Sequence, residues 1–493
     1  MKLSALASLF PHAELTGGDP EITGIATDSR KVAPGDLFVC LPGFTVDGHD
    51  YAALAIERGA AALVVERPLP LSIPSIRVKD CHYAVAVISS HYYGYPSERL
   101  KVIGVTGTNG KTTTTAIIDS LLRAQGHGTG LMGTIRTVIA GEVFDTPNTT
   151  QEAFVLQKNF NRMVEAGADY GIMEVSSHAL DLGRVKGVRY RTAIFTNLTQ
   201  DHLDYHKTME NYLAAKGLLF SRLGNEFSSD PERRQYAVLN ADDPASAAFA
   251  AMTTAHTLTY GIDNECDVRA ENVRLTNRGT EFRLVSYAGT SDICTKLVGK
   301  FNVYNALAAI TAVLLEGVPL ASIREHLEEM PPVEGRMEMV EAGQDFLALV
   351  DYAHSPDGLE NALAAIRQFA EKKVITVFGC GGDRDRTKRP IMGEIAGRYS
   401  DYVLATSDNP RTEDPAAILR EIEGGLSQTG AGHYEIIEDR RAAIKKAVEQ
   451  AGPGDVLLIA GKGHETYQEI NRIRHHFDDR EEVRDAIKGV RIQ

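Results

Sequence analysis

A glycine-rich segment with a lysine and two threonines, Gly107-Thr-Asn-Gly-Lys-Thr-Thr113, is the part of this sequence best suited to phosphate chemistry. It lies between an apolar run at 102–105, typical of a strand, and a helical pattern at 116–124. In such a strand–loop–helix unit, backbone N–H groups and the helix N-terminus point at an anion. We expect Lys111 to reach the outer phosphates of a nucleotide and one of the two threonine hydroxyls to ligate Mg²⁺.

The loop departs from the common phosphate-loop pattern at Val105, where that pattern has its first glycine. The shorter form Gly-Thr-Asn-Gly-Lys-Thr remains, so a glycine-rich turn without a ligand is the alternative interpretation. The strand before the loop, the helix after it and the Lys-Thr-Thr end favour a nucleotide site.

Two segments with acidic and histidine side chains follow expected strands further along the chain. Glu174 ends the apolar run 170–174, where a carboxylate can hold Mg²⁺ directly or through water; a surface acid is the alternative. Asp201-His-Leu-Asp-Tyr-His206 follows the run 192–196. Zinc is disfavoured there because no separate cluster supplies a fourth ligand. We therefore interpret His202 as a ligand of a second metal or of a phosphate.

Lys216 and two asparagines lie in expected helices. Lys216 stands among the apolar residues of 212–220, so it is either an exposed helix lysine or a buried amine with a lowered pKa. Asn302 and Asn305 open the helix expected to continue over 303–315, where amide groups can read the edge of a base. Helix capping by Asn302 is the alternative.

Length and composition indicate an ordinary protein of several domains. The 493 residues are too many for one core and favour two to four domains. The 52 basic and 66 acidic residues give a net charge of −14, which argues against nucleic acid as the main partner. Five scattered cysteines without CxxC spacing fit a reducing cytosol. No apolar run reaches about 18 residues, and residues 1–10 predict a short amphipathic helix, so we expect a cytoplasmic protein without a membrane span.

Composition shifts divide the chain into three α/β units, 1–98, 99–331 and 332–493, with Pro331-Pro332 as the second linker. In the middle unit strands and helices alternate, which favours a parallel sheet covered by helices, and 267–298 predicts an antiparallel insertion. The expected strands are 36–41 and 61–65 in the first unit, 102–105, 170–174, 192–196, 236–240 and 256–260 in the second, and 346–351, 374–378, 402–405 and 456–460 in the third.

Strands of the third unit lead into loops rich in glycine and charged residues, and ligands of open α/β sheets bind at such strand ends. Carboxylates there can bind an ammonium and arginines can bind a carboxylate, so the loops suit a zwitterion. Just after the linker, Arg336 can meet the charge of a γ-phosphate and Asp351 can accept from a ribose; linker or capping roles are the alternatives. The loops are Gly379-Cys-Gly-Gly-Asp-Arg-Asp-Arg386, Ser407-Asp-Asn-Pro-Arg411 and Gly461-Lys-Gly-His-Glu465.

Together these motifs resemble the Mur ligases of bacterial cell-wall synthesis, and within them the members that add the third residue of the peptide. The resemblance covers nearly the whole chain, in family order. It implies an α/β fold of three domains: a central phosphate-loop parallel sheet with helices, an N-terminal UDP-binding α/β domain and a C-terminal Rossmann-like domain. The matching segments are Thr27-Asp-Ser-Arg30, the phosphate loop, Asn148-Thr-Thr150, EVSSHAL, DHLDYH, YLAAKGLLF, EGRME, DYAHSPD, GCGGDRD, DNPR and GKGHE.

The resemblance also implies roles for individual residues. The implied catalytic residues are Lys111, Glu174, His202, Lys216 and Arg336. The implied ATP-binding residues are Gly107, Thr108, Asn109, Gly110, Lys111, Thr112, Thr113, Asn302, Asn305, Arg336 and Asp351. The implied contacts of the acceptor, UDP-MurNAc-L-Ala-D-Glu, are Ser29, Asn148, Thr149, Thr150, Ser176 and Arg184. The implied Mg²⁺ ligands are Thr112, Glu174, His202 and Lys216, the last as a carbamate derived from CO₂.

The added amino acid is indicated by Asp408-Asn-Pro-Arg411, which resembles the motif of members that take meso-diaminopimelate. This amino acid has a second carboxylate that an arginine fork can bind, whereas lysine would leave Arg411 unpaired. Leu182 departs from the glutamine of some relatives and leaves an acceptor contact open. The implied diaminopimelate contacts are Arg384, Asp408, Asn409, Pro410, Arg411, Gly461 and Glu465.

The implied reaction is ATP-dependent activation of the D-Glu γ-carboxylate as an acyl phosphate, followed by attack of the diaminopimelate amine. We expect a monomer with no nucleic-acid partner. Lysine as the added amino acid is one alternative, and a folylpolyglutamate synthase, which shares the short phosphate loop, is another. A nucleotide-binding regulatory or transport ATPase would leave the loops of the third unit without a role. An inactive protein of the same fold would not need Lys111, Glu174, His202 and Lys216.

Overall fold

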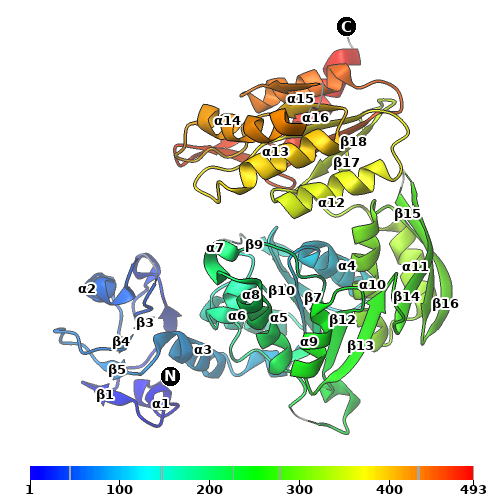
Figure 1. The fold of residues 1–493 in the computed structure, drawn as a ribbon. Coiled ribbons are helices and arrows are strands. Elements are labelled where there is room, and N and C mark those ends of the chain that lie inside the picture. The colour runs from blue at the N-terminus through cyan, green and yellow to red at the C-terminus, as the bar shows by residue number, and fades with distance from the viewer. Residues whose placement is uncertain are drawn as a thin grey trace.

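The computed structural model describes residues 1–43, 46–144, 146, 148–225, 227–276, 279–429 and 433–491. Each of the three sequence units contains a sheet of its own, and Figure 1 shows them as three lobes. The middle lobe lies between the other two, and α3 (Cys81–Tyr92) leads from the first lobe toward it. None of the helices in the described part of the chain is both long and apolar enough to span a membrane.

The first sheet has five strands in the order β1-β5-β4-β3-β2, all parallel except β1. The two expected strands are present, although the first ends at Val39 instead of residue 41. The expected helix over 1–10 is shorter, five residues long, with no side-chain cap at Lys2. The elements are α1 (Leu3–Ala7), β1 (Glu14–Thr16), β2 (Gly24–Ala26), η1 (Ser29–Lys31), β3 (Asp36–Val39), α2 (Ala52–Glu57), β4 (Ala62–Val65) and β5 (Ser75–Arg77).

The middle sheet has eleven strands in the order β16-β15-β14-β13-β12-β11-β6-β10-β7-β8-β9. Its centre is parallel, as the alternation of strands and helices predicts. The expected antiparallel insertion proves to be an extension of this sheet, because β14 pairs with β13. The strands are β6 (Lys101–Thr106), β7 (Thr129–Met132), β8 (Thr137–Ile139), β9 (Glu142–Phe144), β10 (Tyr170–Glu174), β11 (Tyr190–Phe195), β12 (Tyr236–Asn240), β13 (His256–Gly261), β14 (Val268–Thr276), β15 (Gly279–Ser286) and β16 (Gly289–Thr295).

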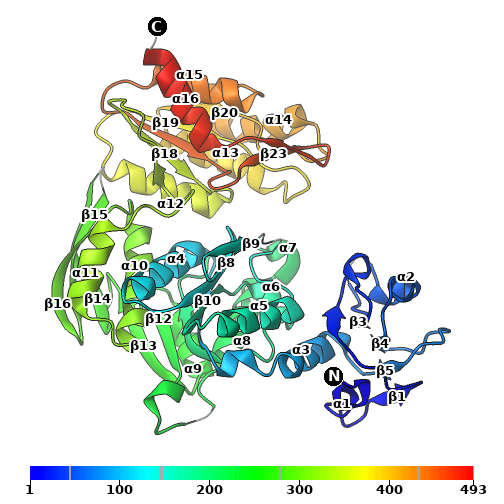
Figure 2. The same ribbon diagram turned by 180° about the vertical axis from the view of Figure 1, so that it is seen from behind.

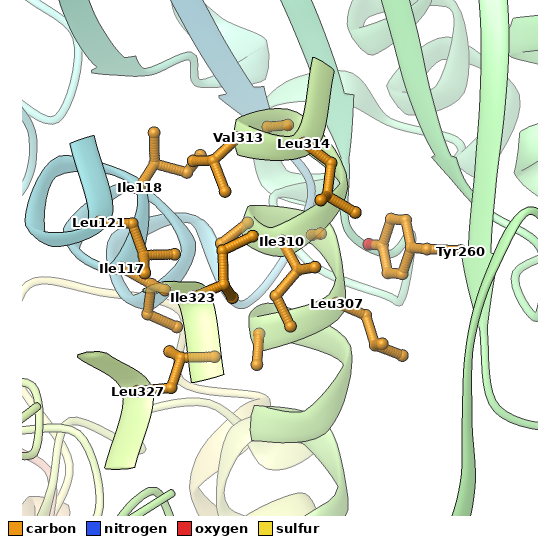
Figure 3. Packing of buried hydrophobic residues seen from close by; sticks show 14 of the residues in the cluster. Ile117, Ile118, Leu121, Tyr260, Leu307, Ile310, Val313, Leu314, Ile323 and Leu327 are labelled. Atoms are coloured by element: carbon orange, nitrogen blue, oxygen red, sulfur yellow. The ribbon is translucent and has the colours of Figure 1, made fainter. Parts of the chain in front are cut away.

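Helices cover this sheet and fix the phosphate-loop helix in place. Figure 3 shows side chains of α4, α10 and α11 pointing toward one another, with Ile117, Ile310 and Ile323 fully buried. Burying an aliphatic side chain of this size contributes about 1.5–3 kcal/mol. The helices are α4 (Lys111–Ala124), α5 (Ala153–Glu165), α6 (Ser177–Asp181), α7 (Leu203–His206), α8 (Met209–Ser221), α9 (Ala245–Met252), α10 (Lys300–Leu315) and α11 (Leu320–Glu329).

The third sheet has six strands in the order β17-β18-β22-β19-β20-β21, all parallel except β17. All four expected strands are present. A separate two-stranded hairpin, β23 (Tyr467–Ile470) and β24 (Ile473–His476), lies outside this sheet (Figure 2). The remaining elements are β17 (Glu338–Met339), β18 (Leu347–Asp351), α12 (Pro356–Arg367), β19 (Val374–Phe378), α13 (Lys388–Tyr399), β20 (Tyr402–Ala405), α14 (Pro415–Leu426), β21 (Tyr434–Ile436), α15 (Arg440–Gln450), β22 (Val456–Ala460) and α16 (Asp479–Arg491).

Candidate active site

The phosphate loop joins β6 to α4 through two glycines that the geometry requires. Gly107 has φ +152° and Gly110 has φ +86°, conformations that L side chains rarely adopt. A Cβ atom would lie 1.8 Å from Thr196 Oγ1 at the first position and 2.2 Å from Asn305 Oδ1 at the second. Because α4 begins at Lys111, the N–H groups of its first turn are available to an anion.

Lys111 and Lys216 meet at one carbonyl oxygen of this loop. Both Nζ atoms donate to Gly107 O, at 2.9 Å from Lys111 and at 2.8 Å from Lys216. Burial lowers the pKa of Lys111; burial, reinforced by the charge of Lys111, holds the pKa of Lys216 well below its ordinary value. The Lys216 side chain is 1% exposed. The alternative of an exposed helix lysine is wrong.

Glu174 ends β10 and is 1% exposed, so the alternative of a surface acid is also wrong. Its Oε1 atom accepts from the backbone N–H of Thr134 at 2.7 Å, and Oε2 accepts from the Thr134 hydroxyl at 2.9 Å. The charge of Glu174 opposes the effect of burial on the pKa of Lys111. The carboxylate and the phosphate-loop lysine therefore belong to one electrostatic site.

His202 precedes α7 with φ +55°, and its ring centroid lies 4.8 Å from that of His178. Its side chain is 45% exposed and lies 3.5 Å from Asp201. Lys111 and Lys216 both interact electrostatically with His202, which places it at the same site. Within the described residues no group of three or more His, Cys, Asp or Glu side chains could hold a metal ion.

Arg336 connects the third unit to the phosphate-loop helix. Its Nη2 atom donates to Thr112 Oγ1 at 3.1 Å, and its guanidinium lies 4.7 Å from the centroid of the Tyr352 ring. Asp351 at the end of β18 is buried and accepts from the backbone N–H of Met337 at 2.7 Å. Burial raises the pKa of Asp351, whereas the charge of Arg336 opposes that effect. Arg336 is therefore held beside the phosphate loop, and Asp351 lies near Arg336.

Asn302 and Asn305 project from the start of α10 beside the phosphate loop. The side-chain amide of Asn305 donates to Asn302 Oδ1 at 3.0 Å, and that of Asn302 donates to Val298 O at 2.8 Å. The helix begins at Lys300, three residues before the expected run 303–315, and its N-cap is Gly299. The capping alternative for Asn302 is therefore wrong.

Four of the six implied acceptor contacts form a cluster around the end of β10. Thr150 Oγ1 donates to Glu174 O at 2.9 Å and accepts from Ser176 N at 2.9 Å. Thr149 accepts from Thr134 Oγ1 at 3.1 Å, and Arg184 donates to Thr150 O at 3.2 Å. Outside this cluster, Ser29 is buried in η1 of the first unit and Asn148 is exposed.

The loops of the third sheet form a buried network around Asn409. Its side-chain amide donates to Glu465 Oε2 at 2.8 Å, and Lys462 donates both to Asn409 Oδ1 at 3.1 Å and to Glu465 Oε2 at 3.3 Å. Lys462 is fully buried and Asp408 is 8% exposed. Burial raises the pKa of Glu465, and the charge of Asp408 raises it further. Lys462 is thus a buried cation beside the buried carboxylate of Asp408 and the partly buried carboxylate of Glu465.

Arg411 and Arg384 flank Gly381, where a Cβ atom would lie 2.9 Å from Arg411 Nη1 and 3.9 Å from Arg384 Cγ. Arg411 has φ +52° and donates to Gly382 O at 2.7 Å. Gly461, with φ +120°, must lack a side chain because a Cβ atom would lie 2.6 Å from Asp408 Oδ2. Arg384, Arg411 and the buried carboxylate of Asp408 therefore lie close together. Pro410 directly precedes Arg411 in the chain.

Several polar atoms at this site are buried without a hydrogen-bond partner among the described residues. They include Asp408 Oδ2, Arg336 Nε and His464 Nδ1. Buried polar groups are nearly always paired, so such atoms mark a place where a ligand or water supplies the partner. Asp408 Oδ2 lies 3.9 Å from Arg440 Nη1 but accepts no hydrogen bond within the described residues, so it can accept one from an amino-acid ammonium.

Sequence reasoning gave no role to Asp357 or Lys462. Asp357, in the first turn of α12, accepts from Asn109 Nδ2 at 2.5 Å and from Thr199 Oγ1 at 3.0 Å, so it joins the third unit to the phosphate loop. Both residues stand inside the segments DYAHSPD and GKGHE, but an aspartate at a helix start and a lysine in a glycine loop are also ordinary surface residues. Only the fold brings their partners together.

Models of three Mur ligase segments match this chain. The Mur ligase family catalytic domain matches 21–94, the Mur ligase middle domain matches 105–313, and the Mur ligase glutamate ligase domain matches 335–463. These matches follow the order of the three sheets.

Named relatives extend over the full length of the chain. A UDP-N-acetylmuramoyl-L-alanyl-D-glutamate–2,6-diaminopimelate ligase of Geobacillus thermodenitrificans is 54% identical over 492 residues, covering 100% of both chains. The protein of the same name from Bacillus cereus is 51% identical over 490 residues, covering 99% of both. A solved structure with that name is 35% identical, has a TM-score of 0.67 and covers 95% of both chains. The fold of three α/β units is thereby confirmed, and the chain belongs to the Mur ligase family.

Proposed function

We propose that this Mur ligase is an ATP-dependent ligase that joins meso-diaminopimelate to the D-Glu γ-carboxylate of UDP-MurNAc-L-Ala-D-Glu in peptidoglycan synthesis. The observation that carries the proposal is that the third unit, which holds the candidate amino-acid site, is hydrogen-bonded to the phosphate loop. Arg336 and Asp357 of the third unit bond to Thr112 and Asn109 of the phosphate loop. The same unit carries the Asn409 network, whose carboxylates and nearby arginines can bind the ammonium and carboxylate groups of an amino acid. The full-length relatives that bear the name of this ligase support the assignment.

The choice of diaminopimelate rests on Arg411 and Arg384. Their guanidinium groups can bind the second carboxylate of diaminopimelate, while Asp408 and Glu465 can accept from its ammonium group. Lysine has no second carboxylate, so its binding would leave Arg411 without an anionic partner. Lysine is therefore the second candidate, and the names of the relatives favour diaminopimelate.

The proposed reaction has two steps, formation of the acyl phosphate and attack of the amine on it. Lys111 and Arg336 neutralise the charge that develops when an oxygen of the γ-carboxylate attacks the γ-phosphorus of ATP, and ADP leaves. Asp408 and Glu465 accept from one ammonium group of the amino acid, and its other amino group, as the neutral amine, faces the acyl phosphate. The amine nitrogen then attacks the acyl carbon and loses a proton, and inorganic phosphate leaves. Closure of the third unit on the phosphate loop, where Asp357 already accepts from Asn109, would exclude water from the acyl phosphate.

The side chains around the phosphate loop fit Mg²⁺ once Lys216 is carbamylated. Two buried amines that share Gly107 O would repel one another if both were charged, and Lys216 has the lowered pKa of an amine able to react with CO₂. The carbamate, Glu174, His202 and the Thr112 hydroxyl would then hold the metal. Bound Mg²⁺ supplies Lewis-acid stabilisation of the phosphate oxygens.

We further assign UDP-sugar binding to residues 1–98 with Ser29, ATP binding to 99–331 and amino-acid binding to 332–493, in a monomer. The acceptor dipeptide is assigned to Asn148, Thr149, Thr150, Ser176 and Arg184. Thr149, Thr150, Ser176 and Arg184 cluster at the end of β10 beside Glu174, which supports this assignment because the γ-carboxylate must approach the phosphate loop.

The test is phosphate release by the purified protein with ATP, Mg²⁺ and UDP-MurNAc-L-Ala-D-Glu, comparing meso-diaminopimelate with L-lysine. We expect release only with diaminopimelate. Release with lysine would retain the ligase and overturn the choice of amino acid. Release without any amino acid would favour a regulatory ATPase, and release with folate and glutamate would favour a folylpolyglutamate synthase.

A further inference from the structure

The β23–β24 hairpin contributes little to the core of the third unit. All four residues of β24 are exposed, and Ile473 keeps 61% of its surface in solvent. The hairpin pairs with no strand of the six-stranded sheet (Figure 2). An isolated two-stranded hairpin is marginally stable in water, so its fixed position depends on contacts elsewhere.

Those contacts are made to the Asp408–Arg411 loop. The side-chain amide of Gln468 donates to Asp408 O at 2.8 Å, and the backbone N–H of Glu469 donates to Asn409 Oδ1 at 2.9 Å. One strand of the hairpin therefore holds both the backbone and a side chain of the loop that carries the amino-acid contacts.

Arg411 receives the closest support. Its backbone N–H donates to Glu469 O at 3.0 Å, and its carbonyl accepts from Asn471 N at 2.6 Å. Arg411 has φ +52°, a left-handed conformation that costs a non-glycine residue energy unless the surroundings impose it. The two hairpin bonds bracket the strained residue and fix the direction in which its side chain leaves the loop.

The conformation of the hairpin turn orients the Asn471 N–H toward the Arg411 carbonyl. Asn471 and Arg472 have φ +50° and +65°, the pair of positive angles of a type I′ turn. Asparagine tolerates the conformation better than most residues, so the turn keeps its geometry without a glycine.

We propose that the β23–β24 hairpin is a positioning element for amino-acid specificity, because it holds Arg411 in the orientation that recognises the second carboxylate of diaminopimelate. The inference rests on the proposed function. It adds that the hairpin acts on the KM for diaminopimelate and on discrimination against lysine, and leaves the phosphate loop unaffected.

The test compares three variants of the full-length enzyme. Asn471→Pro removes the N–H donor and cannot adopt φ +50°. Gln468→Met keeps the side-chain length and removes only the donor to Asp408. Arg472→Gly is the matched control, because glycine preserves the turn and the Asn471 N–H. KM for meso-diaminopimelate, KM for ATP and kcat/KM for L-lysine are measured for each, with Tm as a check on folding.

We expect Asn471→Pro to raise the KM for diaminopimelate about tenfold and Gln468→Met about threefold, with the KM for ATP within about twofold of wild type. The ratio of kcat/KM for diaminopimelate to that for lysine should fall in parallel, and Arg472→Gly should resemble wild type. Equal increases in both KM values would show a general loss of structure and overturn the inference.

An unchanged KM for diaminopimelate in Gln468→Met and Asn471→Pro would also overturn the inference. If Asn471→Pro does not fold, Gln468→Met alone decides. Failure of the wild-type enzyme to use diaminopimelate would instead refute the proposed function, and the inference with it.

Discussion

The phosphate loop and the amino-acid site both lie at the carboxyl ends of parallel strands, but different interactions hold them in place. The phosphate loop is one continuous segment whose glycines and helix N-terminus define its shape through the backbone. The amino-acid site is assembled from three loops and a hairpin, and buried side chains such as Lys462 and Asn409 hold it together. A site shaped by the backbone is little affected by substitution of neighbouring side chains. In a network of hydrogen-bonded side chains, one substitution disturbs the other members.

The difference predicts which substitutions affect chemistry and which affect binding. Substitutions at the phosphate loop should lower kcat, because this loop is proposed to contact the reacting phosphate. Substitutions in the Asn409 network should raise the KM for the amino acid, because this network is proposed to contact the zwitterion.

Lys111→Ala should lower kcat for phosphate release by about 10³-fold, because the charge developing on the phosphate loses a preorganised cation. Steady-state phosphate release with all three substrates measures the effect. Lys79→Ala, an exposed lysine of the first unit, is the control and should retain wild-type kcat. A loss of less than tenfold in Lys111→Ala would contradict the role of the loop lysine.

Lys216→Ala should lower kcat by about 10²-fold, and short carboxylates such as formate or acetate should partly restore it. The reason is that the proposed carbamate supplies carboxylate oxygens, which a small acid can replace in the space left by the side chain. Activity is measured with and without the acids. Full activity of the variant without them would refute the carbamate.

Arg411→Ala should raise the KM for diaminopimelate by about 10- to 100-fold, the value of a lost charge-assisted bond, with the KM for ATP within about twofold. Arg411→Lys should lie between the variant and wild type, because it keeps the charge and loses the fork. Initial rates at varied concentrations of each substrate separate the two constants. Equal effects on both KM values would remove the distinction between the two sites.

How much of the molecule could be predicted from sequence follows the same division. Strand, loop and helix around Lys111 are contiguous, so residue spacing alone predicted the phosphate loop and the strands beside it. The central parallel sheet followed from the alternation of strands and helices. Its extension by β14 to β16 did not, because the pairing of β14 with β13 depends on the neighbouring strand and not on the pattern within 267–298.

The amino-acid site was predicted only in part. Spacing indicated that charged loops follow the strands, and family resemblance supplied Arg411 and Glu465. The bonds of Lys462 to Asn409 and of Asp357 to Asn109 join residues 53 and 248 positions apart in the chain. Partners so distant are set by the packing of whole units, which local patterns do not record.

Acid should weaken the third unit through His464. Burial, reinforced by the charge of Arg336, lowers the pKa of His464 to about 3. Between pH 6.5 and about 3, the unfolded chain binds a proton at His464 that the folded chain does not, so the free energy of unfolding falls as pH falls. The slope is about 1.4 kcal/mol per pH unit for one such group.

Denaturant unfolding of wild type and His464→Asn between pH 5 and 7 measures this slope. The free energy of unfolding should fall less steeply with falling pH in the variant than in wild type, because asparagine does not titrate. Equal slopes in wild type and His464→Asn would contradict the prediction.

Asp357→Ala should have the smallest effect, a rise of about fivefold in the KM for ATP, because it removes the bonds from Asn109 and Thr199 but no contact with the reacting atoms. Asp357→Asn should be milder, since its amide oxygen still accepts from Asn109. Glu371→Ala, an exposed acid of the same unit, is the control for loss of charge. If Asp357→Ala instead raised the KM for diaminopimelate alone, this contact would belong to the amino-acid site. Substitutions at the two sites would then not separate into effects on ATP and effects on the amino acid.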